Sequence, residues 1–289
     1  MNPSLPPTPG IPVEERAPRW RRDTGSATQL PTPCVSVEVC DLHKSFYAQE
    51  VLKGINLKIA PGEIFAIMGP SGSGKSVLLK HIIGLLQPDS GDVLIQGDSI
   101  ASPGIRDKYR MAMVFQSAAL LTSLNVAENV GIYLAEHRLC PPAEIARIVT
   151  AQLEAVGLKG VEDRMPNELS GGMQKRVAIA RALIIDPQLI LFDEPTSELD
   201  PLMAVLVGGE ILKLKSLTQA TSIVVTHDRD LAFGIADRVA MIIAGEILFV
   251  GTPDEFQRHP DPRIHNFVDA HLPAPRSSSK STDSNTSNL

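Results

Sequence analysis

An eight-residue stretch of this chain has the residue types and spacing needed to hold a phosphate chain. It matches the pattern G-x-x-x-x-G-K-[ST] and ends at Lys75 and Ser76. Its glycines let the backbone turn N–H groups inward, where side chains would block an anion. Lys75 supplies a point charge for β- and γ-phosphates, and the Ser76 hydroxyl is placed to ligate Mg²⁺. The expected nucleotide-binding residues here are Gly69, Pro70, Ser71, Gly72, Ser73, Gly74, Lys75, Ser76 and Val77.

The flanking sequence supports this interpretation. Residues 64–68 form a short apolar run typical of a buried strand, and residues 77–86 are mostly apolar and long enough for a helix. The helix would aim its positive end at the same anion. A glycine-rich turn with an exposed lysine is the alternative, but it would not require a strand before, a helix after and a complete match to the pattern.

Three further apolar runs are each followed by polar residues. Continuous apolar strands with helical crossovers imply a mostly parallel, covered sheet, and ligands of such sheets bind at the carboxyl edge of the strands. Any one of these polar residues could be an ordinary strand-end residue or a turn cap, but their joint occurrence favours a ligand site. The runs and the residues after them are 112–115 with Gln116, 189–192 with Asp193 and Glu194, and 222–226 with His227 and Asp228.

The chemistry of these side chains suits metal-assisted attack of water on a phosphate. Asp193 can hold Mg²⁺, directly or through water. Glu194 should point differently because successive strand residues alternate faces, and its carboxylate can orient or deprotonate the water. His227 can sense or stabilise a γ-phosphate as a neutral imidazole. Gln116 can reach metal and water from a loop that could move. The expected catalytic residues are Glu194, His227 and Gln116, and the expected metal ligands are Ser76, Gln116 and Asp193.

A second anion site is expected where the sequence Leu-Ser-Gly-Gly-Met, residues 169–173, opens a helix. Ser170 would cap the helix, and the two glycines would expose backbone N–H groups. A plain N-capped helix is the alternative for this segment taken alone. Lys175 is expected opposite the apolar face of the helix, which is formed by Met173, Val177, Ala180 and Ile184.

Together these motifs resemble those of an ABC transporter ATPase subunit over residues 35 to about 250. The resemblance implies an α/β P-loop NTPase fold with a mostly parallel core sheet, an antiparallel β subdomain and a helical subdomain near 117–188. It also implies ATP and Mg²⁺ as cofactors and a head-to-tail homodimer, with ATP between one phosphate loop and the other chain's Ser170 segment. Phe46, rather than Tyr47, is the expected adenine-stacking aromatic. The remaining nucleotide contacts implied are Ser170, Gly171, Gly172 and Asp200. The motifs, in order, are the phosphate loop, Gln116, 169–172, 189–194, 197–200 and His227.

A narrower resemblance is to the ATPases of Mla-type systems, which work with MCE proteins and move phospholipids between membranes. It implies a membrane permease, an MCE-type lipid-binding protein, sometimes a small STAS-domain subunit, and a place on the cytoplasmic face of the bacterial inner membrane. Met173 replaces a glutamine common in ABC signatures but suits this subfamily, and Glu198 stands where a small residue is commoner. The segments that carry this resemblance are 76–84, 115–121, 169–176 and 261–263 before Phe267.

Two other functions remain open at this stage. The chain could be an ABC ATPase for another cargo, such as an amino acid, or a non-transport ATP-dependent clamp. Translation-type clamps usually carry two ATPase halves in one chain, and only one set of motifs is present. Clamps that act in DNA repair carry a long coiled-coil insertion, for which the sequence shows no pattern.

The composition and net charge of the chain exclude some classes of protein and partner. The chain has 289 residues, 43% of them hydrophobic and 21% charged, which is ordinary for a globular protein. A net charge of −6 argues against a nucleic-acid partner, and no apolar run approaches the ~20 residues of a membrane span. Three cysteines without metal-ligand spacing favour a reducing compartment. The expected organisation is a disordered proline-rich tail at 1–33, an ATPase domain at 34–272 and a disordered serine-rich tail at 273–289.

Overall fold

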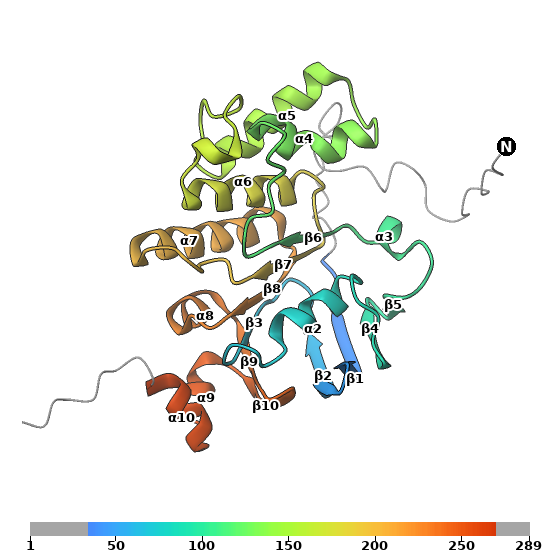
Figure 1. Ribbon diagram of the computed structural model, residues 1–289, viewed down its shortest axis with the longest axis vertical. Coiled ribbons are helices and arrows are strands. Elements are labelled where there is room, and N and C mark those ends of the chain that lie inside the picture. Colours follow the sequence, from blue (N-terminus) through green and yellow to red (C-terminus); the bar gives the residue numbers. More distant parts are fainter. Residues whose placement is uncertain (1–33, 270–289) are drawn as a thin grey trace, which may run out of the picture.

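The computed structural model describes residues 34–269, so the two expected tails lie outside the described residues. The domain boundaries proposed from the sequence therefore stay predictions. Figure 1 shows the arrangement of the elements. In chain order they are β1 (Val37–Phe46), β2 (Gln49–Ile59), β3 (Ile64–Met68), α2 (Lys75–Ile82), β4 (Ser90–Ile95), β5 (Asp98–Ser99), α3 (Ile105–Lys108), β6 (Met111–Val114), α4 (Val126–Glu136), α5 (Pro142–Ala155), the 3-10 turn η2 (Pro166–Glu168), α6 (Gly171–Leu183), β7 (Leu189–Asp193), α7 (Pro201–Thr218), β8 (Thr221–Thr226), α8 (Arg229–Ile235), β9 (Arg238–Ile243), β10 (Glu246–Gly251), α9 (Pro253–Gln257) and α10 (Pro262–Asp269).

The core is a six-stranded sheet in the order β10-β9-β3-β8-β7-β6, in which every neighbouring pair is parallel except β10 with β9. All residues of β3, β7 and β8 are buried, which explains why their sequences read as continuous apolar runs. The predicted mostly parallel, covered sheet is confirmed. Its four site-bearing strands β3, β8, β7 and β6 are consecutive neighbours, so their carboxyl ends meet at one edge.

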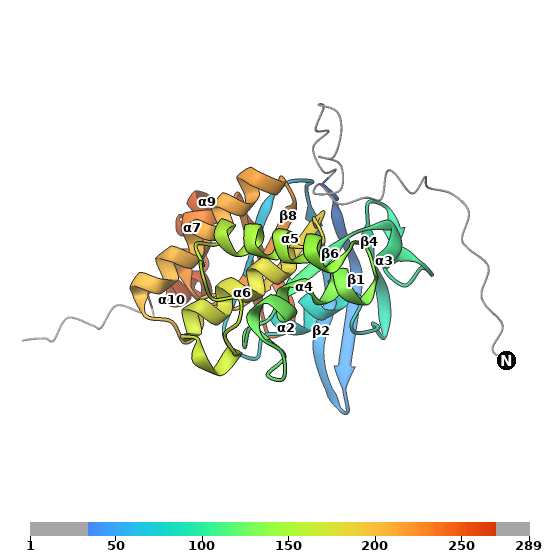
Figure 2. The ribbon, with the colours of Figure 1, turned by 90° about the horizontal axis from the view of Figure 1, so that it is seen from above.

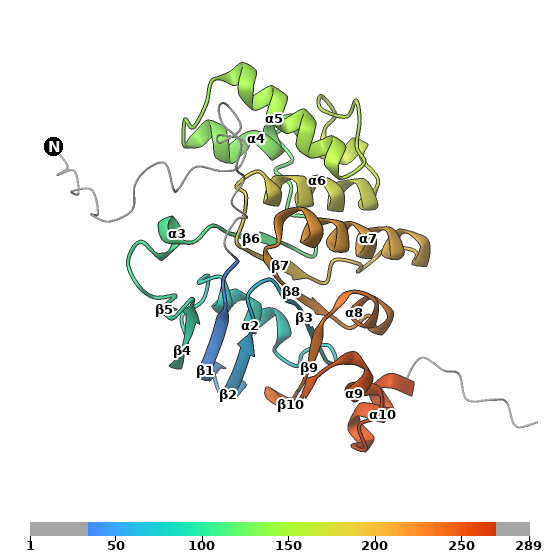
Figure 3. The ribbon, with the colours of Figure 1, turned by 180° about the vertical axis from the view of Figure 1, so that it is seen from behind.

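The two faces of this sheet are covered by different layers. Side chains such as Ile190 and Phe192 pack into a cluster with α6, α7 and α8, whereas Leu189 and Leu191 pack with α2 and the antiparallel sheet. The alternation follows from the period of two along a strand. Figures 1 and 3 show α4, α5 and α6 gathered at one end of the molecule, and these helices lie nearest the viewer when it is seen from above in Figure 2. The three helices fall inside 117–188, the range expected for a helical subdomain.

The antiparallel sheet has the order β2-β1-β4-β5, and its strand β1 extends beyond the apolar alternation of its sequence. The alternation of apolar residues ends near Val39, but β1 continues to Phe46. The pairing of β1 with β2 shifts register at three places after Val39, and such bulges break the period of two that sequence analysis relies on. Gly91 packs against the same irregular stretch, where a β-carbon would lie 2.1 Å from the Asp41 carbonyl oxygen.

The helix boundaries follow the local signals in the sequence. Asn125 and Glu128 form a capping box at the start of α4, with both reciprocal hydrogen bonds at 2.8 Å. Helix α5 begins at Pro142 and ends just before Gly157, which has φ of 71°. Among the helices between residues 34 and 269, none is both long enough and apolar enough to cross a membrane.

Candidate nucleotide-binding and hydrolysis site

The phosphate loop joins β3 directly to α2, as the sequence predicted. Gly69, Gly72 and Gly74 have φ of 152°, 79° and 102°, values that L side chains rarely adopt. Two of them are also confined by neighbouring strands. A β-carbon on Gly69 would lie 2.2 Å from the Ile242 carbonyl oxygen of β9, and one on Gly74 would lie 2.8 Å from Leu52 of β2. The loop therefore depends on glycine both for its turns and for its close packing.

The Lys75 side chain folds back onto the backbone of this loop. Its Nζ donates to the carbonyl oxygens of Gly69 and Pro70 at 2.8 and 3.0 Å, and it lies 3.8 Å from Glu194 Oε1. The side chain is only 6% exposed. Burial lowers the pKa of the ammonium from its usual value, while the carboxylates of Glu194 and Asp193 oppose that shift. A phosphate group bound at the loop would therefore meet the Lys75 ammonium in an already desolvated position.

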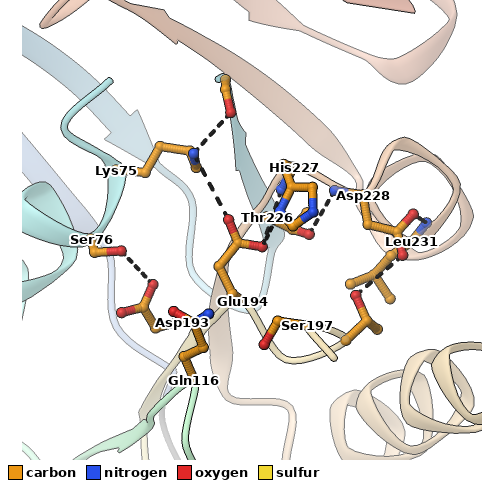
Figure 4. Close-up of polar contacts among 12 residues, drawn as sticks. Lys75, Ser76, Gln116, Asp193, Glu194, Ser197, Thr226, His227, Asp228 and Leu231 are labelled. Atoms are coloured by element: carbon orange, nitrogen blue, oxygen red, sulfur yellow. Dashed lines mark hydrogen bonds and ion pairs between the residues drawn. The ribbon is translucent and has the colours of Figure 1, made fainter. Parts of the chain in front are cut away.

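Ser76 and Asp193 are brought together from separate elements. The Ser76 hydroxyl at the start of α2 donates to Asp193 Oδ1 at the end of β7, at 2.7 Å (Figure 4). Hydroxyl and carboxylate oxygens are ligands that Mg²⁺ prefers, so the pair fits the metal predicted for it. No cluster of three or more His, Cys, Asp or Glu side chains within residues 34–269 could hold a metal by itself. Gln116 lies beside Asp193 in Figure 4 and is exposed at the end of β6.

Glu194 points away from Asp193, but not for the reason expected from strand alternation. Strand β7 ends at Asp193, and Glu194 follows it with φ of 47° and with its N–H donating to the Val225 carbonyl at 2.8 Å. The left-handed backbone turns the carboxylate toward His227. There Glu194 Oε2 accepts from the His227 ring Nδ1–H at 2.8 Å and from its backbone N–H at 3.2 Å. Asp228, the next residue, instead caps α8 by accepting from the Leu231 N–H.

The remaining predicted residues lie outside this cluster. Ser170 is exposed and caps α6 by accepting from the Met173 N–H at 3.3 Å. No hydrogen bond between described residues joins the 170–172 segment to the phosphate loop of the same chain. Asp200 caps α7, accepting from the N–H groups of Leu202 and Met203. Phe46 is 39% exposed at the end of β1, with Lys44 Nζ 5.7 Å from its ring centroid.

The burial of Lys175 in this region was not predicted from the sequence. Lys175 was expected on the side of α6 away from the apolar face, and the structure buries it to 6% exposure. Its Nζ donates to the Gln116 carbonyl at 2.7 Å and contacts the segment that follows Glu194. A cation in the first turns of a helix is unfavourable beside the positive end of the helix dipole. The position of Lys175 near the start of α6 therefore indicated that its ammonium binds acceptors outside the helix.

Comparisons with known proteins agree with this geometry. A family model described as ABC transporter matches residues 52–197. The protein TRIGALACTOSYLDIACYLGLYCEROL 3, chloroplastic, of Arabidopsis thaliana is 41% identical over 261 residues, covering 83% of this chain and 75% of that protein. The intermembrane phospholipid transport system ATP-binding protein MlaF of Escherichia coli is 41% identical over 223 residues, covering 76% and 83%. The probable ribonucleotide transport ATP-binding protein mkl of Mycobacterium tuberculosis is 36% identical over 253 residues, covering 86% and 70%.

A solved structure shares the fold. It is the dimeric post-hydrolysis state of the ATP-binding cassette MJ0796 bound to ADP and phosphate, with a TM-score of 0.69 and 32% identity. The match covers 75% of this chain and 98% of that one. A chain of similar sequence and fold thus holds nucleotide products.

Replacing Lys75 with alanine should abolish ATP turnover without unfolding the chain. The ammonium is held by two carbonyl oxygens and packs no core, so its loss should lower the rate by roughly 10²-fold or more. The melting temperature without nucleotide should stay within about 4 °C, the shift expected for 1 kcal/mol. Phosphate-release kinetics and thermal unfolding give both values, with Lys213→Ala, an exposed lysine of α7, as the control. Near-parental hydrolysis would exclude this site, and a large fall in melting temperature would show a structural lysine.

Proposed function

This chain belongs to the ABC transporter family as an ATP-binding and ATP-hydrolysing subunit, and we propose that it energises phospholipid transport between membranes within an MCE-type system. The observation that carries the ATPase assignment is the convergence of Lys75, Ser76, Asp193 and Glu194 at one sheet edge. Support for a lipid cargo comes from the relative MlaF, whose name specifies intermembrane phospholipid transport. The relative mkl is named for ribonucleotide transport, so cargo is the part of the proposal that most needs a direct test.

In the proposed mechanism the chain first positions ATP. The loop N–H groups and Lys75 bind the β- and γ-phosphates, and Phe46 stacks on the adenine. Ser76 and Asp193, with Gln116 nearby, would hold Mg²⁺ against the same phosphates. A bound Mg²⁺ supplies neutralisation of the charge that develops during phosphoryl transfer.

Hydrolysis itself is assigned to Glu194 and His227. Water attacks the γ-phosphorus, its proton passes to the Glu194 carboxylate, and the bond between γ-phosphorus and the bridging oxygen of ADP breaks. The contact of 2.8 Å between His227 Nδ1 and Glu194 Oε2 orients the imidazole ring, and donation from Nε2 to a γ-phosphate oxygen would require a proton on Nε2 as well. Both residues are thus oriented before nucleotide arrives.

Closure of the site is assigned to a second copy of the chain. Ser170 caps α6, and Ser170 and Gly171 are exposed, whereas Gly172 is buried. No hydrogen bond among residues 34–269 ties this segment to the phosphate loop of its own chain, so it can serve the nucleotide of a partner. The dimeric cassette bound to ADP and phosphate supports this homodimer. Glu198 is exposed with φ of 63° in the segment between Glu194 and α7, a conformation better suited to glycine. Its charge would lie near the dimer interface.

A membrane permease is the proposed partner for the loop that follows Gln116, on the cytoplasmic face of a bacterial inner membrane. Leu121 is 45% exposed on this loop, whereas Leu120 packs partly against the core. The loop is held in shape by the buried Asn129 amide, which binds the Leu121 N–H and carbonyl, and by Arg181, which binds two further loop carbonyls. A fixed loop with an exposed leucine suits a docking surface. An MCE-type lipid-binding protein and a STAS-domain subunit complete the proposed assembly.

The cargo is tested by purifying the assembled transporter in detergent and analysing its bound and transported molecules. The proposal predicts enrichment of phospholipid over the lipid of mock-purified membranes. It also predicts ATP-dependent transfer of labelled phospholipid between vesicles, and no ATP-dependent uptake of ribonucleotides into them. Ribonucleotide uptake without lipid transfer would assign the cargo named for mkl, and membrane partners failing to co-purify would favour a clamp.

Replacing Glu194 with glutamine should give a chain that binds ATP and stalls. Glutamine keeps the size but cannot take a proton, so the rate should fall about 10²–10⁴-fold, or roughly 3–5 kcal/mol of barrier. Binding should persist because Ser76, Asp193 and the loop are unchanged. Fluorescent-nucleotide binding and phosphate release on the assembled transporter check both effects. Hydrolysis at the parental rate would remove Glu194 from the mechanism.

The composite dimer is tested by adding Ser170→Arg to Glu194→Gln. The single variant should accumulate a closed ATP-bound dimer, because the dimer is expected to open after hydrolysis. In the double variant a bulky cation would face the partner's γ-phosphate, so the chain should bind nucleotide yet remain monomeric. Size-exclusion chromatography with ATP and Mg²⁺, repeated on the assembled transporter by crosslinking, reads the outcome. Equal closure of the single and double variants would contradict the shared site.

Docking through the exposed leucine is tested with Leu121→Glu. A carboxylate there should weaken assembly with the permease and uncouple lipid transfer, because burying it would require desolvating a charge. The isolated chain should keep its ATPase activity. Val250→Glu is the matched control, since Val250 on β10 is 37% exposed and lies on the opposite edge strand of the core sheet. Transport and assembly that survive Leu121→Glu would place the permease elsewhere.

A further inference from the structure

Lys175 joins three segments that the mechanism uses separately. From α6 its Nζ donates to the Gln116 carbonyl at 2.7 Å, the Ser197 hydroxyl at 3.2 Å and the Glu194 carbonyl at 3.3 Å. Gln116 follows β6 and Glu194 follows β7, while Ser197 lies in the turn that leads to α7. One ammonium thus connects the helix capped by Ser170 with the backbone of the proposed base.

The contacts use the full capacity of the side chain. An ammonium has three hydrogens to donate, and the structure supplies three neutral acceptors. Burial lowers the pKa of Lys175, while the carboxylates of Glu198, Glu194 and Asp193 favour its charged form. A lysine that served only to cover apolar surface would extend its ammonium into water. The Lys175 ammonium instead points into the protein, where it donates to two backbone carbonyl oxygens and one hydroxyl.

We propose that Lys175 is a positioning residue for ATP hydrolysis, holding the backbone of Glu194 and Gln116 of its own chain in the reactive geometry. It acts through these two residues and touches no nucleotide. The left-handed backbone at Glu194, with φ of 47°, needs an external restraint of this kind, and the Lys175 bond to the Glu194 carbonyl supplies one. The inference rests on the roles proposed above for Glu194 and Gln116.

The contact between Lys175 and Ser197 connects the site to the proposed second chain. Ser197 and Ser170 both belong to segments proposed to meet the partner, and Lys175 lies one turn into the helix that Ser170 caps. A displacement of the Ser170 segment on docking would be transmitted through Lys175 to the backbone of Glu194.

The direct test is Lys175→Met in the full-length chain and in the assembled transporter. Methionine retains the length and apolar stem but has no donors. Because displacement of a catalytic group by about 1 Å can lower the rate by 10²-fold, we expect kcat to fall roughly tenfold or more. No hydrogen bond or ion pair within the described part of the chain joins Lys175 to the phosphate loop, so KM for ATP and the affinity for a fluorescent ATP analogue should change by no more than about twofold.

Three further variants control the test. Lys175→Arg keeps the charge and several donors and should retain more than about a third of the parental kcat. Lys213→Met should leave kcat unchanged, because Lys213 also donates to a backbone carbonyl, that of Ala155 at 2.6 Å, but outside the site. Lys175→Leu provides a second replacement without donors if the methionine variant does not fold. All rates are measured well below the melting temperature of each variant and per folded molecule.

The outcomes separate this inference from the proposals it rests on. A Lys175→Met or Lys175→Leu chain with parental kcat overturns it, as does a loss that appears only in KM or only as a lower melting temperature. Glu194→Gln is measured in parallel. If Glu194→Gln hydrolyses ATP normally, the proposed base is wrong. If Glu194→Gln is inactive while Lys175→Met keeps the parental kcat, only the role proposed for Lys175 is contradicted. The assay uses ATP and Mg²⁺ without cargo, so the identity of the transported molecule does not affect it.

Discussion

The structure depends on the parallel pairing that brings β3, β8, β7 and β6 side by side. Met68 pairs with Thr226 and Phe192 with Val224, so the residues that follow these strands emerge at one edge. Strands β3, β7 and β8 are buried along their whole length, so a slip of register would draw the polar residues that flank them into the core. The geometry of the site is therefore enforced by the core rather than by the polar residues themselves.

At that edge the polar groups pair with one another. Ser76 donates to Asp193, Lys75 faces Glu194, and Glu194 accepts from His227. Each pairing satisfies groups that burial would otherwise penalise, and each holds a side chain close to where phosphate or metal is proposed to bind. In the proposed site, nucleotide and Mg²⁺ would replace these partners. This preorganisation is what electrostatic catalysis needs.

Much of this could be predicted from sequence because the decisive signals are local. The glycine pattern of the loop, the buried runs of β3 and β7, and the capping residues of α4 and α6 each act within a few positions. What sequence missed depends on distant contacts. Bulges opposite β2 carry β1 past its apolar alternation, and the burial of Lys175 requires acceptors contributed by Gln116 and Glu194, far along the chain. The direction of Glu194 was predicted, but the cause is its left-handed backbone rather than strand alternation.

The central claim is that the paired groups at the sheet edge form the binding site for ATP and its metal. A high-resolution structure of the unmodified chain with Mg²⁺ and a non-hydrolysable ATP analogue tests it most directly. The account predicts that Lys75 Nζ contacts phosphate oxygens, that Ser76 and Asp193 face the cation, and that the strand register is unchanged. Nucleotide bound elsewhere, with the Ser76–Asp193 and Lys75–Glu194 pairs intact, would contradict it.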